Sequence, residues 1–286
     1  MQHEQRLAAL AVCRVLDGAT LPAALAAVAD GAPTRGHALV QELAYGTLRH
    51  WGRVDALVQA LAGRRVTPPI LAALVAIALY QLDHTQAPAF AVVDRAVDAA
   101  ALVGRPQAKA LVNALLRRYL REREALNREV AAASPVARWS YPRWWIGRVE
   151  ADLPQHWQAV LAAGNERPPL TLRVNLRATT RSALADKLRA AGHDTTPIGE
   201  AGLVLAAPRP VAELPGFAEG EFAVQDAGAQ HAAPLLAVRD GMRVLDACAA
   251  PGGKATHVAE IAAVDLTALD RDEARLARVR DNFERL

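Results

Sequence analysis

The residues from Met242 to His257, MRVLDACAAPGGKATH, have the composition of a turn that can bind a small polar ligand. A short apolar strand, Met242 to Leu245, is followed by Asp246, several small residues, a proline and two glycines. Gly252 and Gly253 allow backbone angles that are closed to other residues. A helical segment begins near Ala255, and the free N–H groups at a helix start hold anionic or polar groups.

The choice of ligand depends on what the turn contains and on the strand that follows it. Cys248 stands where a Walker A loop has its first glycine, Ala255 follows Lys254, and the dinucleotide pattern GxGxxG is absent. A second strand, Leu266 to Leu269, ends at Asp270, where Rossmann-type folds hold both hydroxyls of a ribose. Ribose recognition without a pyrophosphate loop indicates S-adenosylmethionine. A tight strand-to-helix turn without a ligand has the same spacing and stays an alternative.

The motif DACAAPGGK, followed by ALDRDEARLARVRDNFERL, resembles the first two motifs of the RsmB/NOP family of RNA cytosine-C5 methyltransferases. Two further stretches support the resemblance, PPLTLRVN at 168–175 and FAVQDAGAQ at 222–230. The likeness to the bacterial branch with a NusB-like N-terminal domain covers essentially the whole chain. It implies transfer of a methyl group from S-adenosylmethionine to C5 of a cytosine in 16S ribosomal RNA.

The resemblance also implies which residues bind the cofactor. The backbone of the loop would receive the methionine portion, Asp270 would hold the ribose hydroxyls, and Lys254 would lie near the target phosphate or the cofactor carboxylate. The predicted cofactor-binding residues are Cys248, Ala249, Ala250, Pro251, Gly252, Gly253, Lys254 and Asp270.

Catalysis requires a thiolate that adds to C6 of the cytosine, because C5 is a weak nucleophile in an intact ring. The family uses a cysteine in a Thr-Cys motif, and a second one in a Pro-Cys motif assists release. The resemblance places both motifs beyond Leu286, and neither Cys13 nor Cys248 matches them. A segment of about 50 residues with two strands cannot complete a doubly wound sheet. We therefore predict no catalytic residue in this sequence and expect the chain as given to be an inactive piece of a parent enzyme and to bind S-adenosylmethionine weakly at best.

The first 133 residues show helical periodicity and no β-like alternation, which predicts an all-α bundle of about seven helices. The expected helices are 5–17, 21–29 (ended by Asp30-Gly31), 37–51, 54–61, 70–82, 92–103 and one from 106. The segment 70–82 is apolar nearly all round and should be central. ELAYGTLR, ALYQL and LVNALLRRYL agree with the NusB-like domain that the resemblance implies.

The charge of the chain is uneven. Residues 1–150 carry 18 Lys/Arg against 12 Asp/Glu, whereas residues 151–286 carry 15 against 18. A basic first half suggests contact with a polyanion, although many helical domains reach such a charge without one. The predicted RNA-binding residues are Arg6, Arg14, Arg49, Arg53, Arg64 and Arg65, with Arg117 and Arg118 next. For each of these arginines, an ordinary solvated helix face is the alternative.

The segment between the bundle and the cofactor loop predicts a small α+β module, which is RRM-like in the family. Strands are expected at 170–176, 203–205 and 221–225, a helix at 182–191, and a helix N-cap at Asp226. Four tryptophans, at 139, 144, 145 and 157, should pack one domain onto the next, with base stacking as the alternative. The predicted domains are 1–133 (NusB-like bundle), 134–232 (linker helices and module) and 233–286 (first β-α-β-α part of a Rossmann-like methyltransferase domain).

Composition excludes several classes of protein. Two distant cysteines supply no disulfide framework, and no metal site is expected, which fits a reducing cytoplasm. The longest apolar run, 70–80, is about half of what spans a bilayer. We expect a monomer that binds small-subunit ribosomal RNA. A non-catalytic NusB-like RNA-binding module is the competing hypothesis, and the failed Walker pattern disfavours an ATPase.

Overall fold

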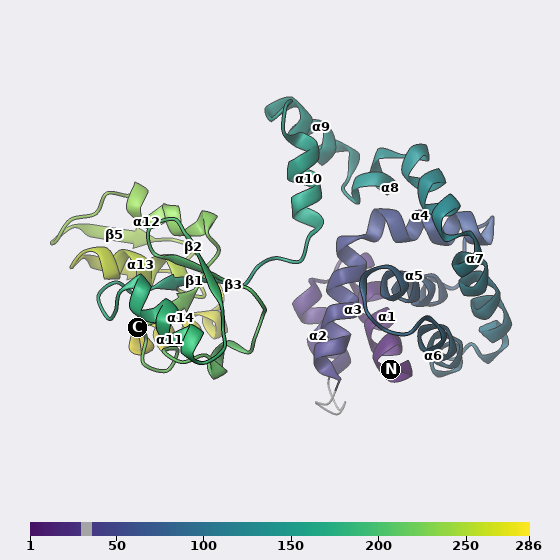
Figure 1. Cartoon of the computed structure of the whole chain (residues 1–286), viewed down its shortest axis with the longest axis horizontal. Coiled ribbons are helices and arrows are strands. Elements are labelled where there is room, and N and C mark those ends of the chain that lie inside the picture. The colour runs from purple at the N-terminus through teal and green to yellow at the C-terminus, as the bar shows by residue number, and fades with distance from the viewer. Residues whose placement is uncertain (30–35) are drawn as a thin grey trace. The chain divides into compact units, whose positions relative to one another are not determined.

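The computed structural model describes residues 1–29 and 36–286, which form two units, Met1–Arg167 and Pro168–Leu286 (Figure 1). The first unit is helical over its described residues. Its helices are α1 (Gln2–Leu16), α2 (Leu21–Ala29), α3 (His37–Arg49), α4 (Trp51–Ala62), α5 (Pro69–His84), α6 (Ala89–Leu102), the 3-10 turn η1 (Pro106–Ala108), α7 (Lys109–Ala133), α8 (Pro135–Trp139), α9 (Arg143–Asp152) and α10 (Trp157–Asn165).

The predicted bundle is confirmed, with α1 to α7 within residues 1–133. The predicted helix 37–51 ends earlier than expected, at Arg49, because the chain turns at His50 and Trp51 begins α4. The predicted stop of the second helix at Asp30-Gly31 lies outside the described residues.

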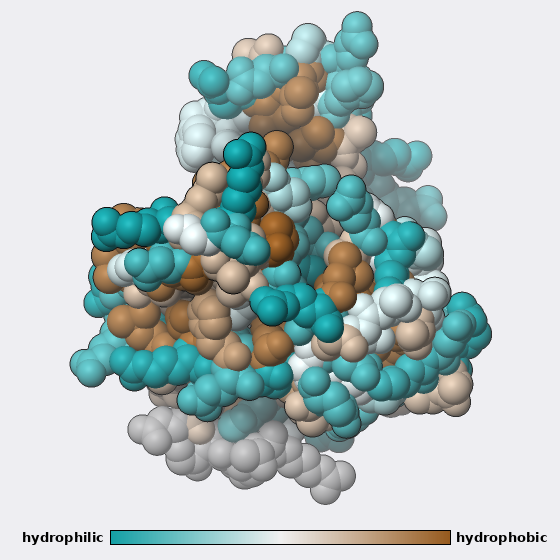
Figure 2. All heavy atoms as spheres, turned by 90° about the vertical axis from the view of Figure 1, so that its left-hand side faces the viewer, coloured by the Kyte–Doolittle hydropathy of each residue, from teal (hydrophilic) through white to brown (hydrophobic). Residues whose placement is uncertain are grey.

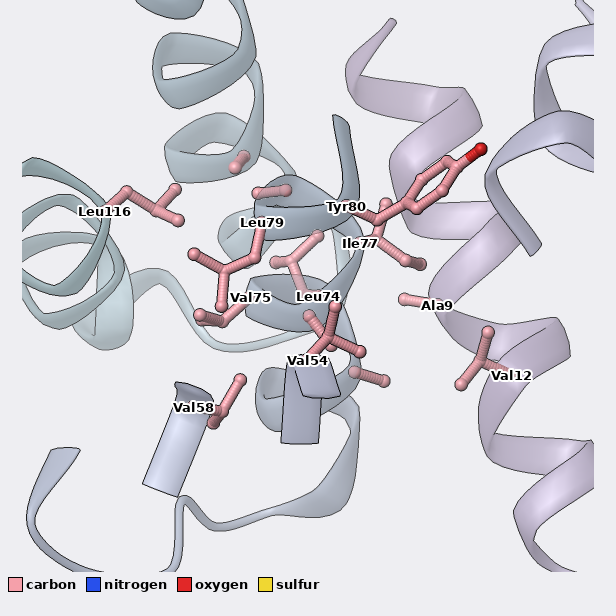
Figure 3. Close-up of a cluster of buried hydrophobic side chains, with 14 of the residues drawn as sticks. Ala9, Val12, Val54, Val58, Leu74, Val75, Ile77, Leu79, Tyr80 and Leu116 are labelled. Atoms are coloured by element: carbon pink, nitrogen blue, oxygen red, sulfur yellow. The ribbon is translucent and has the colours of Figure 1, made fainter. Parts of the chain in front are cut away.

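The helix α5 is the centre of the first unit. Every residue from Ala73 to Leu82 is buried, as expected for a helix that is apolar all round. Its start combines extended Pro68 with Pro69 at the first helical position, where the missing N–H has no cost. In the core, α5 side chains such as Ile77 and Leu79 lie among residues of α1, α4 and α7 (Figure 3).

The helices α8 to α10 belong to the first unit, whereas the sequence grouped residues 134–167 with the module that follows. The physical reason is that α8 packs against α4 and α7. The rings of Trp139 and Trp157 pack edge to face, with their centroids 5.6 Å apart, in a small core that includes Leu161. Two of the four tryptophans therefore pack inside this unit. Packing of one domain onto the next by the tryptophans stays a prediction, and so do the three domain boundaries.

The second unit begins with a four-stranded antiparallel sheet. Its elements are β1 (Thr171–Val174), α11 (Arg181–Ala190), β2 (Thr195–Ile198), β3 (Gly202–Leu205), the 3-10 turn η2 (Val211–Glu213) and β4 (Phe222–Val224), in the order β2-β3-β1-β4. The sheet and α11 enclose a core that includes Leu172, Leu188 and Leu203. The α+β module is thus confirmed. The strand β2 escaped prediction because Pro197 lies within it, which an edge strand tolerates.

The rest of the second unit is a β-α-β unit with a further helix. It comprises η3 (Gly228–His231), α12 (Ala232–Leu235), β5 (Arg243–Asp246), α13 (Gly253–Ile261), β6 (Asp265–Ala268) and α14 (Glu273–Arg285), and β5 pairs with β6 in parallel. This confirms the predicted β-α-β-α start of a Rossmann-like domain. The predicted N-cap at Asp226 is wrong by one position: Ala227 precedes η3, while the Asp226 carboxylate accepts a hydrogen bond from the Gly228 N–H.

The strands β5 and β6 are only partly covered. The side of the second unit that carries β5 shows brown apolar residues among teal polar ones (Figure 2). Met242, Leu245 and Leu269, at or next to these strands, are among the exposed large hydrophobic residues. Solvent therefore reaches these three side chains, whereas Ala249 and Gly252 in the loop that follows β5 are buried.

Candidate functional site

The loop between β5 and α13 is fixed to the carboxyl ends of both parallel strands. The Ala249 N–H donates to the Leu269 carbonyl at 2.9 Å, and the Leu269 N–H donates to the Asp246 carbonyl at 2.8 Å. The Asp246 carboxylate accepts a hydrogen bond from the Cys248 N–H at 3.1 Å. Ligands of open α/β sheets bind at this end of the strands, so the geometry is that of a binding loop.

The Asp270 carboxylate binds the middle of this loop. One oxygen accepts the Ala250 N–H at 3.2 Å, and the other accepts the Asp272 N–H at 3.1 Å. The Arg275 guanidinium donates to the Ala250 carbonyl and lies 3.7 Å from Asp270 Oδ1. The Asp272 N–H, together with the Ala250 N–H and Arg275, lowers the pKa of Asp270 below its ordinary value. The carboxylate is therefore charged at neutral pH. Each oxygen has a second lone pair, although only 6% of the side chain is exposed.

The glycine at the start of α13 is required by its surroundings. Gly252 has a φ of +102°, which favours glycine, and an added Cβ would lie 3.3 Å from the Val279 Cα in α14. The Asn282 side chain of α14 donates to the Pro251 carbonyl at 2.9 Å. The helix α14 thus supports the loop from behind, while Lys254 is exposed in the first turn of α13.

All eight predicted cofactor-binding residues lie in this loop or bond directly to it. The first turn of α13 presents backbone N–H groups and the positive end of the helix dipole, which suit a carboxylate. The Asp270 lone pairs suit a pair of hydroxyls. The residues present therefore fit S-adenosylmethionine in both of its polar portions, although their binding role stays a prediction.

Arg173 is a residue of the site that the sequence analysis missed. It lies in β1 and is fully buried, and its guanidinium bonds the first turn of α13 through the Gly253 carbonyl at 2.5 Å. Its carboxylate partner is Glu260, further along α13. In the sequence Arg173 lies in the stretch PPLTLRVN, which supported the family resemblance without giving Arg173 a role. Its partners are more than 50 positions away, so the stretch does not show what Arg173 contacts.

The candidate RNA-binding arginines differ in their surroundings. Arg6 donates to the Leu102 carbonyl at 3.1 Å, and Arg53 makes two hydrogen bonds to Asn127 Oδ1, so both hold the bundle together. Arg14, Arg64 and Arg65 are exposed and Arg49 is half-buried. The pair Arg64 and Arg65 borders an open cavity of about 590 Å³ that Trp51, Asp55 and Gln59 also line. This pair is the strongest candidate for phosphate contact.

A stacked histidine pair is a second feature without a sequence signal. The rings of His50 and His84 lie 4.1 Å apart, and Tyr80 stacks against both. Burial, followed by the charge of His84, Arg49 and Arg53, lowers the pKa of His50 to about 4. The His50 ring is therefore neutral at neutral pH.

Neither cysteine has the surroundings of an activated nucleophile. Cys13 is half-buried in α1, where burial raises the pKa of its thiol, and Cys248 is exposed in the loop. Within residues 1–29 and 36–286, no three His, Cys, Asp or Glu side chains gather as a metal site would require. None of the helices in the same ranges is long and apolar enough to cross a membrane.

Comparison with known proteins covers all three parts of the chain. The "NusB family" profile matches residues 2–121, the "Methyltr_RsmF/B-like, ferredoxin-like domain" profile matches 141–212, and the "16S rRNA methyltransferase RsmB/F" profile matches 233–286. The first and third matches agree with the helical bundle and the β-α-β-α segment. The second match includes α9 and α10 of the first unit as well as most of the α+β module.

Curated relatives match over nearly the whole chain. "Ribosomal RNA small subunit methyltransferase B" of Citrobacter koseri is 39% identical over 291 residues, covering 100% of this chain and 68% of the relative. The proteins of the same name from Pseudomonas syringae and Vibrio cholerae are 41% and 40% identical, each over 98% of this chain and over 64% and 65% of the relative, respectively. The chain thus spans about two thirds of these relatives. A solved structure, "Crystal Structure of PH0851", shares the fold at 20% identity, with a TM-score of 0.71 over 100% of this chain and 67% of that one.

Proposed function

Since the chain belongs to the RsmB/F family of 16S ribosomal RNA methyltransferases, we propose that it binds S-adenosylmethionine and 16S ribosomal RNA for methylation of a cytosine at C5. The observation that carries the cofactor half is the Asp270 carboxylate, which bonds the Ala250 N–H and so joins the tip of β6 to the loop after β5.

The cofactor, when bound, supplies a methyl group on a positively charged sulfur. Asp270 binds the two ribose hydroxyls through its remaining lone pairs. The N–H groups at the start of α13 and the Lys254 ammonium, exposed beside them, bind the methionine carboxylate.

The nucleophilic step needs a thiolate, and neither cysteine of the 286 residues is proposed for it. Cys13 is in the bundle core region with a raised pKa. Cys248 is exposed in the loop that we propose binds the cofactor. We expect the 286-residue polypeptide to bind its ligands without turning them over.

The RNA half of the proposal rests on the first unit. The exposed Arg14, Arg64 and Arg65 can contact phosphates, whereas Arg6 and Arg53 act through the bundle. This unit also supports the competing function, an RNA-binding module of the NusB type that needs no cofactor.

The two functions differ in one measurement. Equilibrium dialysis of the 286-residue polypeptide with labelled S-adenosylmethionine, with ATP as competitor, should give saturable binding that ATP does not displace. Binding of a 16S ribosomal RNA fragment with no saturable binding of S-adenosylmethionine would favour the RNA-binding module. Displacement by ATP alone would revive the nucleotide-binding hypothesis.

A further inference from the structure

The side chain of Arg173 crosses from the sheet of the module to the helix that follows the cofactor loop. Arg173 has no solvent exposure. Its Nε and Nη2 donate to the two oxygens of Glu260 at 3.2 and 2.5 Å, and Nη2 also donates to Thr256 Oγ1 at 3.1 Å. Nη1 donates to Gln225 Oε1 at 2.6 Å and to the Gly253 carbonyl at 2.5 Å. A guanidinium has five N–H donors, and here five hydrogen bonds use them.

Four of these five acceptor atoms, from three residues, lie on α13. Gly253 is its first residue, and Thr256, in the first turn, also donates from its hydroxyl to the Gly252 carbonyl at 2.9 Å. Glu260 lies near the end of the same helix. The guanidinium therefore hydrogen-bonds to residues near both ends of α13. It bonds directly to the Gly253 carbonyl, and Thr256 links it to the Gly252 carbonyl.

The other side of the contact is rigid. Arg173 occupies β1, which pairs with both β3 and β4, and Gln225 directly follows β4. The Gln225 N–H donates to the Thr171 carbonyl at 3.1 Å, so its backbone continues the sheet. A planar guanidinium held on a central strand restricts the orientation of the bonded helix more than a flexible side chain does.

A role in stability alone is the simpler explanation for a buried ion pair. Buried pairs of this kind contribute little net stability, because desolvation offsets their attraction. Burial raises the pKa of Glu260, and Arg173 counteracts that shift, as expected for such an offset. Five hydrogen bonds also restrict the orientation of the Arg173 guanidinium relative to α13, whatever their net contribution to the free energy of unfolding.

We propose that Arg173 is a positioning residue that holds the first turn of α13, so that the Gly252-Gly253-Lys254 backbone keeps one ligand-binding geometry. The identity of that ligand rests on the proposed function, whereas the ordering of the loop by Arg173 does not. Loss of the fork should therefore loosen the loop before it unfolds the second unit.

The test compares Arg173→Lys with Leu188→Ala in the whole 286-residue protein. Lysine keeps the charge but loses the planar fork, and Leu188 is a buried residue of α11 in the core of the module. The readout is hydrogen–deuterium exchange of the amides of 249–257, with urea unfolding to compare the stability of the two variants. Arg173→Lys should raise exchange there about tenfold more than Leu188→Ala does, as for one lost charge-assisted hydrogen bond. Equal exchange in the two variants at equal stability would overturn the proposal.

A milder pair of variants covers the case in which Arg173→Lys fails to fold. Thr256→Ala removes the hydroxyl that links Arg173 to Gly252, and Thr256→Ser keeps it. Exchange in 249–257 should rise for the alanine variant and stay at the wild-type rate for the serine variant. The same exchange in both would overturn the proposal.

Affinity for labelled S-adenosylmethionine separates this proposal from the proposed function. If the wild type binds and Arg173→Lys weakens binding about tenfold more than Leu188→Ala, both stand. If the wild type does not bind but Arg173→Lys still loosens the loop, the result contradicts S-adenosylmethionine as the ligand and supports the positioning role. If the wild type binds and the loop amides exchange at the same rate in Arg173→Lys and Leu188→Ala, the result contradicts the positioning role and supports S-adenosylmethionine as the ligand.

Discussion

The Asp270 carboxylate accepts a hydrogen bond from the Ala250 N–H at 3.2 Å, across twenty positions of sequence. The bond joins the residue after β6 to the loop after β5, so the acid and the small-residue loop form one site. Their separate signals in the sequence, an acid after a strand and a glycine pair before a helix, describe two sides of the same contact.

The Gly252→Ala substitution should weaken both folding of the second unit and cofactor binding. Alanine at a φ of +102° is strained, and its Cβ would press on the Val279 backbone. We expect a loss of about 1–3 kcal/mol in the free energy of unfolding, measured with urea. Gly241→Ala is the matched control, because its φ is +78° and nothing lies within 4 Å of its added Cβ. Equal losses in the two variants would show that contact with α14 does not matter.

Replacing Arg64 and Arg65 by glutamine should weaken binding to fragments of 16S ribosomal RNA, by a similar factor whatever the nucleotide sequence of the fragment. Each lost phosphate contact should reduce the slope of log affinity against log salt by about 1. The measurement is fluorescence anisotropy over a salt series. Arg105→Gln with Arg121→Gln is the control, since both are exposed and carry the same total charge. An unchanged slope for the Arg64 and Arg65 variant would place the RNA contact elsewhere.

The first unit should lose stability as the pH falls from about 6.5 to about 4. His50 has a folded pKa of about 4, below its ordinary value, so the unfolded chain binds more protons in this range. Burial likewise lowers the pKa of His84, although the charge of Asp83 opposes that shift. His50 should contribute about 2 kcal/mol to this loss. Urea unfolding of His50→Gln at pH 7 and pH 5 should show a smaller pH dependence than the wild type, and an identical dependence would contradict the assignment.

The Gly46→Ala substitution should destabilise the bundle. Gly46 in α3 packs directly against the ring of Tyr80, whose hydroxyl donates to Glu42 at 2.8 Å. An added methyl group would displace the ring, and we expect a loss of about 1–3 kcal/mol in the free energy of unfolding. The control is Gly147→Ala in α9, where nothing lies within 4 Å of the added Cβ. There, alanine should be neutral or stabilise the helix by up to about 1 kcal/mol, and a similar effect at both positions would contradict the account.

The features predicted from sequence are those that a short stretch determines. The loop and the central helix α5 follow from local composition, since small residues and continuous apolar residues each allow few structures. The strand β2 was missed because Pro197 breaks the local pattern, although an edge strand accepts it.

The features that were missed depend on partners far along the chain. Arg53 looks like an RNA contact, but Asn127, 74 positions away, binds its guanidinium. Arg173 looks like any strand residue until Glu260, 87 positions away, is placed beside it. Neither the helical periodicity around Arg53 nor the PPLTLRVN stretch around Arg173 shows what the side chain contacts, because tertiary packing determines its partners.

The most direct test of the cofactor site is equilibrium dialysis of labelled S-adenosylmethionine with Asp270→Asn. Asparagine keeps the size of the side chain but replaces the charged carboxylate, whose two oxygens would accept hydrogen bonds from the ribose hydroxyls, by a neutral amide with one oxygen. Asp265→Asn is the control, because Asp265 is an exposed acid at the start of β6, away from the loop. The account predicts saturable binding to the wild type and to Asp265→Asn, and binding at least about tenfold weaker for Asp270→Asn. Equal affinity in all three proteins would contradict the assignment of Asp270 and, with it, the cofactor site.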